Sequence, residues 1–215
     1  MRFLITAGPT REPIDPVRYI SNRSSGKMGY AIAAAAMEAG HKVVLISGPV
    51  NVDPPAGCEL ISVSTSAEMF EAVHQRVGQC DVLVMCAAVA DYKPARVSRR
   101  KIKKRNVDLL LELILTRDIL RSLPKKNRNY LVVGFAAETD NLAANAKKKL
   151  REKNCDIIVG NDARIGMESD ENEVVIFFKS GQTRKISRAP KKIIARELVK
   201  IFADVREKGL TKKTQ

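Results

Sequence analysis

The chain has no tryptophan, only four tyrosine and six phenylalanine residues, and no hydrophobic run of membrane-spanning length. Its longest apolar stretches, at 30–37 and 82–90, fall well short of the roughly 20 residues that a membrane helix needs. We therefore expect no association with a membrane. Proteins that bind single-stranded nucleic acid stack the bases on aromatic side chains. So few aromatic residues, without arginine–glycine repeats, argue against that function.

Metal-binding and redox motifs are also missing. The four cysteines (Cys58, Cys80, Cys86 and Cys155) show no CxxC spacing, and the two histidines lie far apart in the sequence. A structural zinc site is therefore not expected. Cys80 and Cys86 lie in or beside apolar segments, which predicts small buried residues in a reducing compartment.

The first residues show neither the apolar region nor the small-residue cleavage site of a secretory signal, because Arg2 leads directly into strand-like residues at 3–6. We therefore predict a cytoplasmic protein. With 215 residues, of which 45% are hydrophobic, the chain is long enough to bury a substantial core. We predict a single nucleotide-binding domain over 1–207 and a polar, disordered tail at 208–215.

One sign of charge dominates. The chain has 38 lysine and arginine residues against 24 aspartate and glutamate residues, which gives a formal net charge of +14. Because aromatic residues are scarce, small polyanions such as nucleotides and phosphates are better partners for this excess than nucleic acid. The less favoured alternative is a basic nucleic-acid-binding module, which predicts affinity for mixed DNA or RNA that falls steeply with salt.

Strand-like and helix-like segments alternate at short spacing. Strands are expected at 2–7, 41–46, 60–63, 81–85, 109–113, 130–133 and 156–159, with a C-terminal hairpin at 173–178 and 183–186. Helices are expected at 26–40, 66–76, 118–123, 138–153 and 189–205. This alternation predicts an α/β fold in three layers, with a mostly parallel sheet covered by helices on both faces.

Ligands of open α/β sheets bind beyond the carboxyl ends of the strands, and four loops at such positions carry unusual residues. The first loop, 8–29, combines glycines, small hydroxyl side chains and three arginines before a helix, which suits an anion at the helix N-terminus. It matches neither GxGxxG nor GxxxxGK[ST], which weakens a dehydrogenase interpretation. The alternative for this loop is a surface segment rich in turn formers.

The other three loops also suit a nucleotide. The second, 86–94, has small residues that let a ring approach the backbone, and Asp91 could accept hydrogen bonds from ribose hydroxyls. In the third, a long loop at 90–106, six of the seven residues from 99 to 105 are basic and could reach a triphosphate or face solvent. The fourth, 134–139, precedes a helix on which Lys149 and Lys153 share one face. Alternatively, Phe135 caps the core and the lysines face water.

Five segments together resemble phosphopantothenate–cysteine ligases, also called phosphopantothenoylcysteine synthetases. They are ITAGPTREPIDPVRYISNRSSGKMGYAIA (5–33), CAAVADYKP (86–94), KIKK (101–104), VVGFAAET (132–139) and the asparagine–aspartate pair at 161–162. The likeness runs from residue 2 to about 202 and implies a modified Rossmann-like fold. It also implies a reaction in which CTP, with Mg²⁺, converts the carboxylate of 4′-phosphopantothenate into an acyl-cytidylate and pyrophosphate. L-cysteine then displaces CMP to give 4′-phosphopantothenoylcysteine.

The resemblance assigns three catalytic residues by position. Lys101, the first lysine of KIKK, would stabilise charge on the triphosphate while the acyl-cytidylate forms, a role that suits a flexible point charge. Asn22 would hold the acyl-cytidylate and serve its reaction with cysteine, because an amide offers both a donor and an acceptor. Arg18 would support Asn22.

The resemblance also implies the nucleotide contacts. Besides Lys101, the implied contacts are Met85, Cys86 and Ala87 along the nucleotide, Asp91 at the ribose, the turn of Ile114, Leu115, Thr116 and Arg117, then Phe135, Lys149 and Lys153. Arg117 departs from the family pattern, in which a proline is common at this position. Ala88 lies beside the site and is expected to shape the pocket of the intermediate. No metal ligands are assigned.

Members of this family are homodimers in which a loop of the partner covers the acyl-substrate pocket. Bacterial members are commonly fused behind a flavin-dependent decarboxylase domain, whereas nothing here precedes Met1. The chain is thus expected to be either a stand-alone ligase or the C-terminal half of such a protein. The choice between CTP and ATP stays open, and the alternative enzyme class is an NAD(P)-binding oxidoreductase of Rossmann type.

Overall fold

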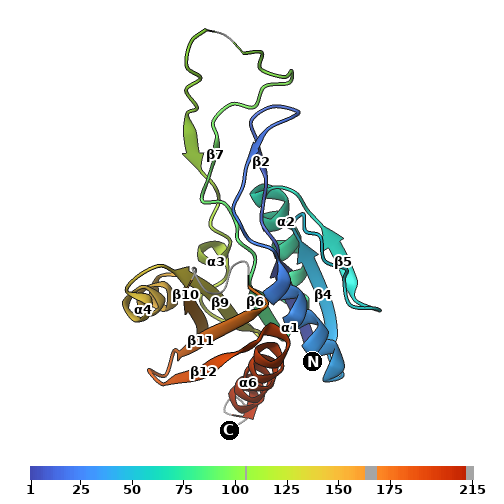
Figure 1. Ribbon diagram of the computed structural model, residues 1–215. Helices are drawn as coiled ribbons and strands as arrows, with labels where there is room; N and C mark the ends of the chain where they lie inside the picture. The colour runs from blue at the N-terminus through green and yellow to red at the C-terminus, as the bar shows by residue number, and fades with distance from the viewer. Residues whose placement is uncertain (105, 163–168, 212–215) are drawn as a thin grey trace.

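A computed structural model of the chain describes residues 1–104, 106–162 and 169–211. Its body is an eight-stranded sheet with the strand order β12-β11-β10-β9-β6-β1-β4-β5 (Figure 1). These strands are β1 (Arg2–Ala7), β4 (Lys42–Ser47), β5 (Glu59–Ser62), β6 (Val82–Met85), β9 (Leu131–Glu138), β10 (Ile157–Asp162), β11 (Glu171–Phe178) and β12 (Thr183–Pro190). The strands from β10 to β5 are parallel, and β11 and β12 add an antiparallel hairpin at one edge. The expected mostly parallel sheet with a C-terminal hairpin is thereby confirmed.

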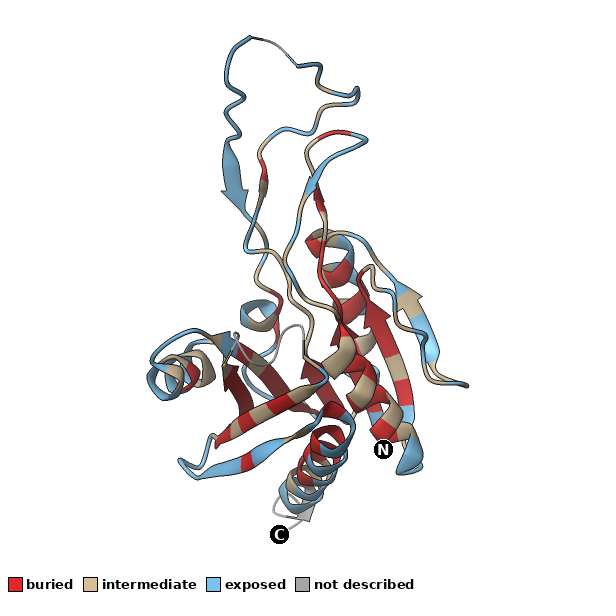
Figure 2. Ribbon diagram, in the orientation of Figure 1, coloured by how far each residue is buried: buried red, intermediate tan, exposed pale blue. Residues whose placement is uncertain are grey.

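Helices cover both faces of the sheet, as expected. One face packs against α1 (Lys27–Glu38) and α6 (Lys191–Thr211), and the other against α2 (Ser66–Arg76), α3 (Ile119–Ser122) and α4 (Leu142–Glu152) (Figure 1). A short helical turn, η1 (Val77–Gln79), follows α2. Central strands are buried on both sides, as Figure 2 shows, because parallel strands between helix layers contact water on neither face.

The N-terminal strand shows how the sequence builds these layers. Along β1, Phe3 and Ile5 enter one apolar core with α1 and α6, whereas Leu4 enters the other core with α2. At its carboxyl end, Ala7 packs so closely against Gly29 of α1 that a Cβ on Gly29 would lie 2.6 Å from the Ala7 Cβ. The start of α1 therefore lies directly against the end of β1, which brings loop 8–29 to the strand ends.

Two long segments extend away from the body on the carboxyl side of the sheet (Figure 1). One is the loop between β1 and α1, which contains the small pair β2 (Glu12–Pro13) and β3 (Tyr19–Ile20). The other, which we call the arm, comprises residues 90–116 and is closed at its base by the antiparallel pair β7 (Tyr92–Pro94) and β8 (Leu113–Leu115). Figure 2 shows that most of the arm is exposed.

The structure corrects several expected boundaries. The strand predicted at 109–113 is wrong, because only Leu113–Leu115 find a pairing partner, in β7. Residues to Glu138 continue β9, so the helix predicted from 138 begins at Leu142. Residues 208–211, expected in a disordered tail, belong to α6. Residues 212–215 of that expected tail, and Arg105, the last residue of the basic run, lie outside the described residues. None of the described helices is long and apolar enough to cross a membrane.

Two buried tyrosines allow a matched test of hydrogen bonding in the core. The hydroxyl of Tyr30 donates to Ser47 Oγ over 2.9 Å, whereas the buried hydroxyl of Tyr130 has no partner among the described residues. Tyr30→Phe is therefore expected to lower the free energy of unfolding by about 1–2 kcal/mol, and Tyr130→Phe to leave it unchanged or slightly higher. Urea unfolding of both variants measures the difference. Equal destabilisation by the two would contradict the assignment.

Candidate nucleotide-binding site

Two adjoining cavities lie at the carboxyl ends of β6 and β9. The α1 cavity, of about 250 Å³, reaches from the N-terminus of α1 to the start of α6. The α4 cavity, of about 500 Å³, lies between the end of β6, the base of the arm, α3 and α4. Both cavities are lined by Ala87, Val89, Asp91, Phe135 and Lys149. Strand order reverses between β1 and β6, so this is the position at which open α/β sheets bind ligands.

Most of the expected nucleotide contacts line these cavities. The α4 cavity is lined by Met85, Ala87, Asp91, Leu115, Thr116, Arg117, Phe135, Lys149 and Lys153. Cys86 and Ala88 line the α1 cavity instead. Ile114, Arg18, Asn22 and Lys101 line neither of them. The sequence motifs at three strand ends thus meet in space, whereas the basic run on the arm does not join them.

Lys149 of α4 and Lys153, at the C-cap of that helix, are held in different ways. Lys149 donates to the backbone oxygen of Phe135 over 2.6 Å. Burial lowers the pKa of Lys149, and the neighbouring charge of Lys153 lowers it further. Lys153 forms an ion pair with Asp118, the residue that caps α3 by accepting from the Arg121 amide. Lys149 therefore gives the cavity a desolvated cation, while the charge of Lys153 is already partly balanced.

The turn at 114–117 is attached both to the arm base and to α2. Thr116 donates from its hydroxyl to Ala90 O over 2.7 Å and from its amide to Asp91 O over 2.9 Å. The Arg117 guanidinium lies 3.9 Å from the ring centroid of Phe70 and pairs with Glu71 over 2.6 Å. The arginine that departs from the family pattern thus fixes this wall of the α4 cavity against α2.

The α1 cavity combines the helix N-terminus, at which the sequence suggested an anion, with charged and polar residues to which the sequence reasoning gave no role. Its floor is the N-terminus of α1, where Gly26 caps the helix with φ +75° and without a side-chain hydrogen bond. Free backbone N–H groups at such a terminus attract anions. Lys27 pairs with Asp170 over 2.6 Å at the rim. The glycines and small hydroxyl side chains of loop 8–29 were the sequence signal for an anion at this terminus.

Lys191, at the first position of α6, is the most unusual residue of the α1 cavity. It is 6% exposed, and its ammonium group makes no ion pair or hydrogen bond within the described part of the chain. Burial lowers the pKa of Lys191, and so does the charge of Lys27. Beside it lies Asn172, which is 3% exposed. A buried cation without a partner is unfavourable unless an anion joins it, so Lys191 favours a negatively charged ligand in this cavity.

The expected catalytic residues fall into two places. Asn22 lies beside the α1 cavity, because its side-chain amide donates over 2.6 Å to the backbone oxygen of Ala88, which lines that cavity. Arg18 instead contacts the arm. It donates to Asp15 over 3.1 and 2.5 Å and to the backbone oxygen of Ile102 over 2.9 Å. Lys101 precedes Ile102 in sequence, so the backbone of Lys101 lies next to the segment that Arg18 contacts.

Asp15 holds Arg18 and the Ile102 segment together. Asp15 is 3% exposed. Its carboxylate also accepts a hydrogen bond from the Ile102 amide over 3.0 Å. The Arg18 guanidinium beside Asp15, together with backbone amides, holds the pKa of that carboxyl well below its usual range. One buried carboxylate therefore connects the β1–α1 loop to the arm. Its importance was not visible in the sequence, because the bonded residues are 87 positions apart.

The sequence of this chain is similar to that of known proteins over nearly its whole length. A family model described as the DNA/pantothenate metabolism flavoprotein C-terminal domain matches residues 1–205. The Coenzyme A biosynthesis bifunctional protein CoaBC of Bacillus subtilis is 46% identical over 204 residues, which cover 93% of this chain and 50% of the relative. The protein of the same name from Escherichia coli K12 is 46% identical over 189 residues, covering 84% and 46%. The chain thus spans about half the length of these curated relatives.

Solved structures agree with the family match. The crystal structure of the C-terminal domain of CoaBC superposes with a TM-score of 0.84 at 43% identity, covering 96% of both chains. A Cab2 mutant in complex with phosphopantothenate-cysteine superposes with a TM-score of 0.81 at 16% identity, covering all of this chain and 89% of the other, which supports the fold alone. The modified Rossmann-like fold and the family resemblance seen in the sequence are confirmed. The chain belongs to the DNA/pantothenate metabolism flavoprotein C-terminal domain family, together with the C-terminal domain of CoaBC.

Proposed function

We propose that the chain is a phosphopantothenate–cysteine ligase, which joins 4′-phosphopantothenate to L-cysteine in coenzyme A biosynthesis. One observation carries the proposal: the α1 cavity combines an uncapped helix N-terminus with the unpaired, buried Lys191 and adjoins a second cavity of nucleotide size. Such a site suits a polyanion. Because its relatives are named for coenzyme A biosynthesis, the polyanions to test are a nucleoside triphosphate and 4′-phosphopantothenate.

CTP is the proposed nucleotide, and the two cavities divide its parts. The base and ribose would lie in the α4 cavity beside Phe135 and Asp91, and the phosphates would extend towards the N-terminus of α1, Lys149 and Lys191. The backbone of 86–88 would lie along the nucleotide, and Ala88 would face the acyl group. Asn22 would hold the acyl-cytidylate while the cysteine amine attacks its carbonyl carbon and CMP leaves.

Mg²⁺ fits this site as an ion carried by the nucleotide. Among the described residues, no group of three or more histidine, cysteine, aspartate or glutamate side chains could hold a metal ion. Mg²⁺ is usually held by one or two carboxylates together with substrate phosphates. When bound, it would neutralise phosphate charge during the first step.

The direct test supplies CTP, Mg²⁺, 4′-phosphopantothenate and L-cysteine and measures pyrophosphate and CMP. We expect both products, with CMP release dependent on cysteine. Failure to form either from active substrates would exclude the proposed reaction. Replacing CTP by ATP in the same assay decides the nucleotide preference.

The oxidoreductase alternative is not favoured, because loop 8–29 lacks the dinucleotide fingerprint and the relatives are named for coenzyme A biosynthesis. It would require binding of NADPH in preference to CTP, which a competition experiment can detect. Location in the cytoplasm stays a prediction from the sequence.

Lys191 and its neighbour Lys192 form a matched pair for testing the phosphate site. Lys191→Gln is expected to weaken CTP binding about tenfold or more, because a charge-assisted hydrogen bond contributes roughly 1.5–3 kcal/mol. Thermal stability should not fall, since the substitution removes a buried, unpaired charge. Lys192 is exposed and pairs with Glu38 over 3.7 Å, so Lys192→Gln should bind CTP normally. Isothermal titration calorimetry on both variants makes the comparison, and equal affinities would refute the role of Lys191.

We further propose a homodimer that forms through the arm. The arm exposes apolar side chains that a monomer would leave in water: Leu110 is 90% exposed, Val107 73% and Leu115 71%. Exposed apolar surface of this extent marks interaction sites. Leu110→Glu is expected to shift the protein from dimer to monomer in sedimentation velocity, whereas Ile193→Glu, at an exposed position of α6, should not. A wild-type monomer at micromolar concentration would contradict the proposal.

A further inference from the structure

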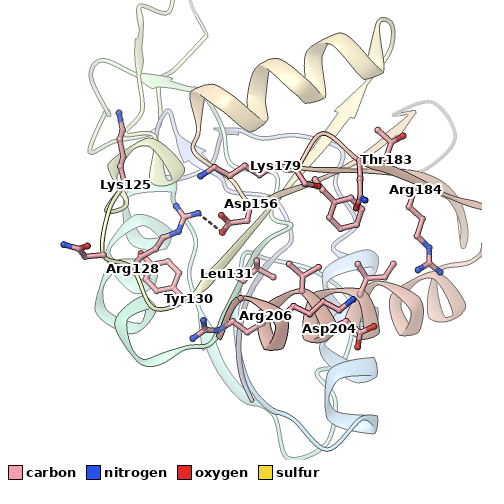
Figure 3. Close-up of a pocket in the computed structure, with 18 residues that line it drawn as sticks. Lys125, Arg128, Tyr130, Leu131, Asp156, Lys179, Thr183, Arg184, Asp204 and Arg206 are labelled. Atoms are coloured by element: carbon pink, nitrogen blue, oxygen red, sulfur yellow. Dashed lines mark hydrogen bonds and ion pairs between the residues drawn. The ribbon is translucent and has the colours of Figure 1, made fainter. Parts of the chain in front are cut away.

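A third cavity, of about 1150 Å³, lies at the opposite end of the sheet (Figure 3). Its walls come from the start of β9, the residue before β10, the turn between β11 and β12, and the C-terminal half of α6. It shares no lining residue with the α1 or α4 cavity. Because it lies beyond the amino ends of the parallel strands, it is separate from the proposed ligase site. We call it the basal cavity.

The basal cavity combines apolar and cationic residues. Its apolar residues include Leu131, Phe178, Ile201 and Val205. Six cationic side chains line it against only two acidic ones, Asp156 and Asp204. The cationic residues are Lys125, Arg128, Lys179, Arg184, Arg206 and Lys208. Figure 3 labels five of them, which come from several elements around the cavity. Part of the net positive charge of the chain thus gathers here, away from the α1 and α4 cavities.

Part of this charge is not balanced within the protein. Arg128 pairs with Asp156 over 2.6 Å, Arg184 with Glu197 over 3.5 Å and Arg206 with Asp81 over 3.9 Å, but Lys125 and Lys208 make no ion pair within the described residues. In addition, two buried polar atoms at the wall, the hydroxyl of Tyr130 and Nε of Arg206, have no hydrogen-bond partner in that part of the chain. Like charges gathered beside unsatisfied donors are unfavourable without an acceptor, and an anionic ligand supplies both the missing charge and the missing acceptors.

We propose that the basal cavity is a second ligand site, which takes a small molecule with an apolar body and one or more oxyanion groups, such as phosphate or carboxylate. The apolar residues would cover the body of the ligand, and Lys125, Arg184 and Lys208 would receive its anionic end. The cavity volume, about 1150 Å³, lies slightly above the range for small-molecule sites, roughly 300–1,000 Å³, so a ligand would fill only part of it. Neither the ligase reaction nor its substrates require this site.

Two probes, used in amide NMR titrations of the full chain, distinguish binding of the apolar body from binding of the anionic group. Anilinonaphthalene sulfonate, an aromatic body with one anion, is expected to shift amides at 127–131, 178–184 and 201–209. Pyrophosphate, an anion without an apolar body, should shift these amides less and act mainly at 24–29 in the α1 cavity. Shifts by the sulfonate confined to the α1 cavity, or absent from all three basal segments, would overturn the proposal whether or not the chain is a ligase.

Two triple variants with equal loss of charge provide the control. Lys125→Gln, Arg184→Gln and Lys208→Gln together are expected to weaken sulfonate binding about tenfold, because each exposed charge contributes modestly. Arg188→Gln, Lys192→Gln and Lys200→Gln remove the same charge from exposed positions of β12 and α6 that do not line the cavity, and binding should be unchanged. Equal weakening by both sets would show general attraction to a basic protein and refute a built site.

Discussion

Replacing Lys101 by glutamine is expected to lower the rate of pyrophosphate release by about 100-fold or more, the usual effect of removing one group that stabilises transition-state charge. CTP binding should be largely retained, because Lys149 and Lys191, which line the α1 cavity, stay in place. Burst-phase measurement of pyrophosphate with CTP and 4′-phosphopantothenate tests the rate, and calorimetry tests the binding. Lys103→Gln, two residues along the same basic run, serves as the control and should keep most of the activity.

The same assay separates Lys101 from Asn22. In Asn22→Asp we expect pyrophosphate release to continue while cysteine-dependent CMP release falls, so that the acyl-cytidylate accumulates. The side-chain amide of Asn22 donates to Ala88 O and its oxygen accepts from the Ser24 amide over 3.1 Å, so aspartate would keep the acceptor and lose the donor. If both variants stop before pyrophosphate release, the two roles are wrongly assigned.

The sheet and its helices were predictable because their signals are local. Apolar runs such as 82–85 form buried strands, and the Ala-rich segment after Gly26 forms α1, since periodicity and capping act within a few residues. The arm did not follow this rule. Residues 109–112 are as strand-like as those of the sheet, yet they are exposed and have no strand beside them. Propensity alone does not determine a strand where no neighbour is available.

The site was predictable only where motifs lie at strand ends. Asp91, Phe135 and Lys149 come from the loop after β6, from β9 and from α4, and the topology brings them to one cavity as the strand-end rule requires. Lys191 and Asn172 were not predicted, because the first residue of a surface-like helix and one asparagine of a hairpin strand carry no sequence signal of burial. Similarly, no spacing rule connects Asp15 to Ile102, since only the folded arm brings them together.

Arg18 and Lys101 are expected to act on the active site of the partner chain. Asn22 lies beside the α1 cavity of its own chain through Ala88. In contrast, Asp15 holds Arg18 of the β1–α1 loop against the Ile102 segment of the arm, and the arm extends away from the sheet (Figure 1). If the arms join two chains, as the exposed leucines suggest, each arm could place its basic cluster over the cavity of the other chain. One site would then need Asn22 of one chain and Lys101 of its partner.

Complementation between two inactive variants tests this arrangement. Heterodimers that pair one Lys101→Gln chain with one Asn22→Asp chain, purified through two different tags, should regain about half of the wild-type activity, since a two-fold dimer has two equivalent sites and one would be intact. A matched control pairs Asn22→Asp with a chain that carries both substitutions, and it should stay inactive. Absence of recovery in the first heterodimer would place Lys101 in its own chain's site, and the arm would then have to fold back over the cavity beside Asn22.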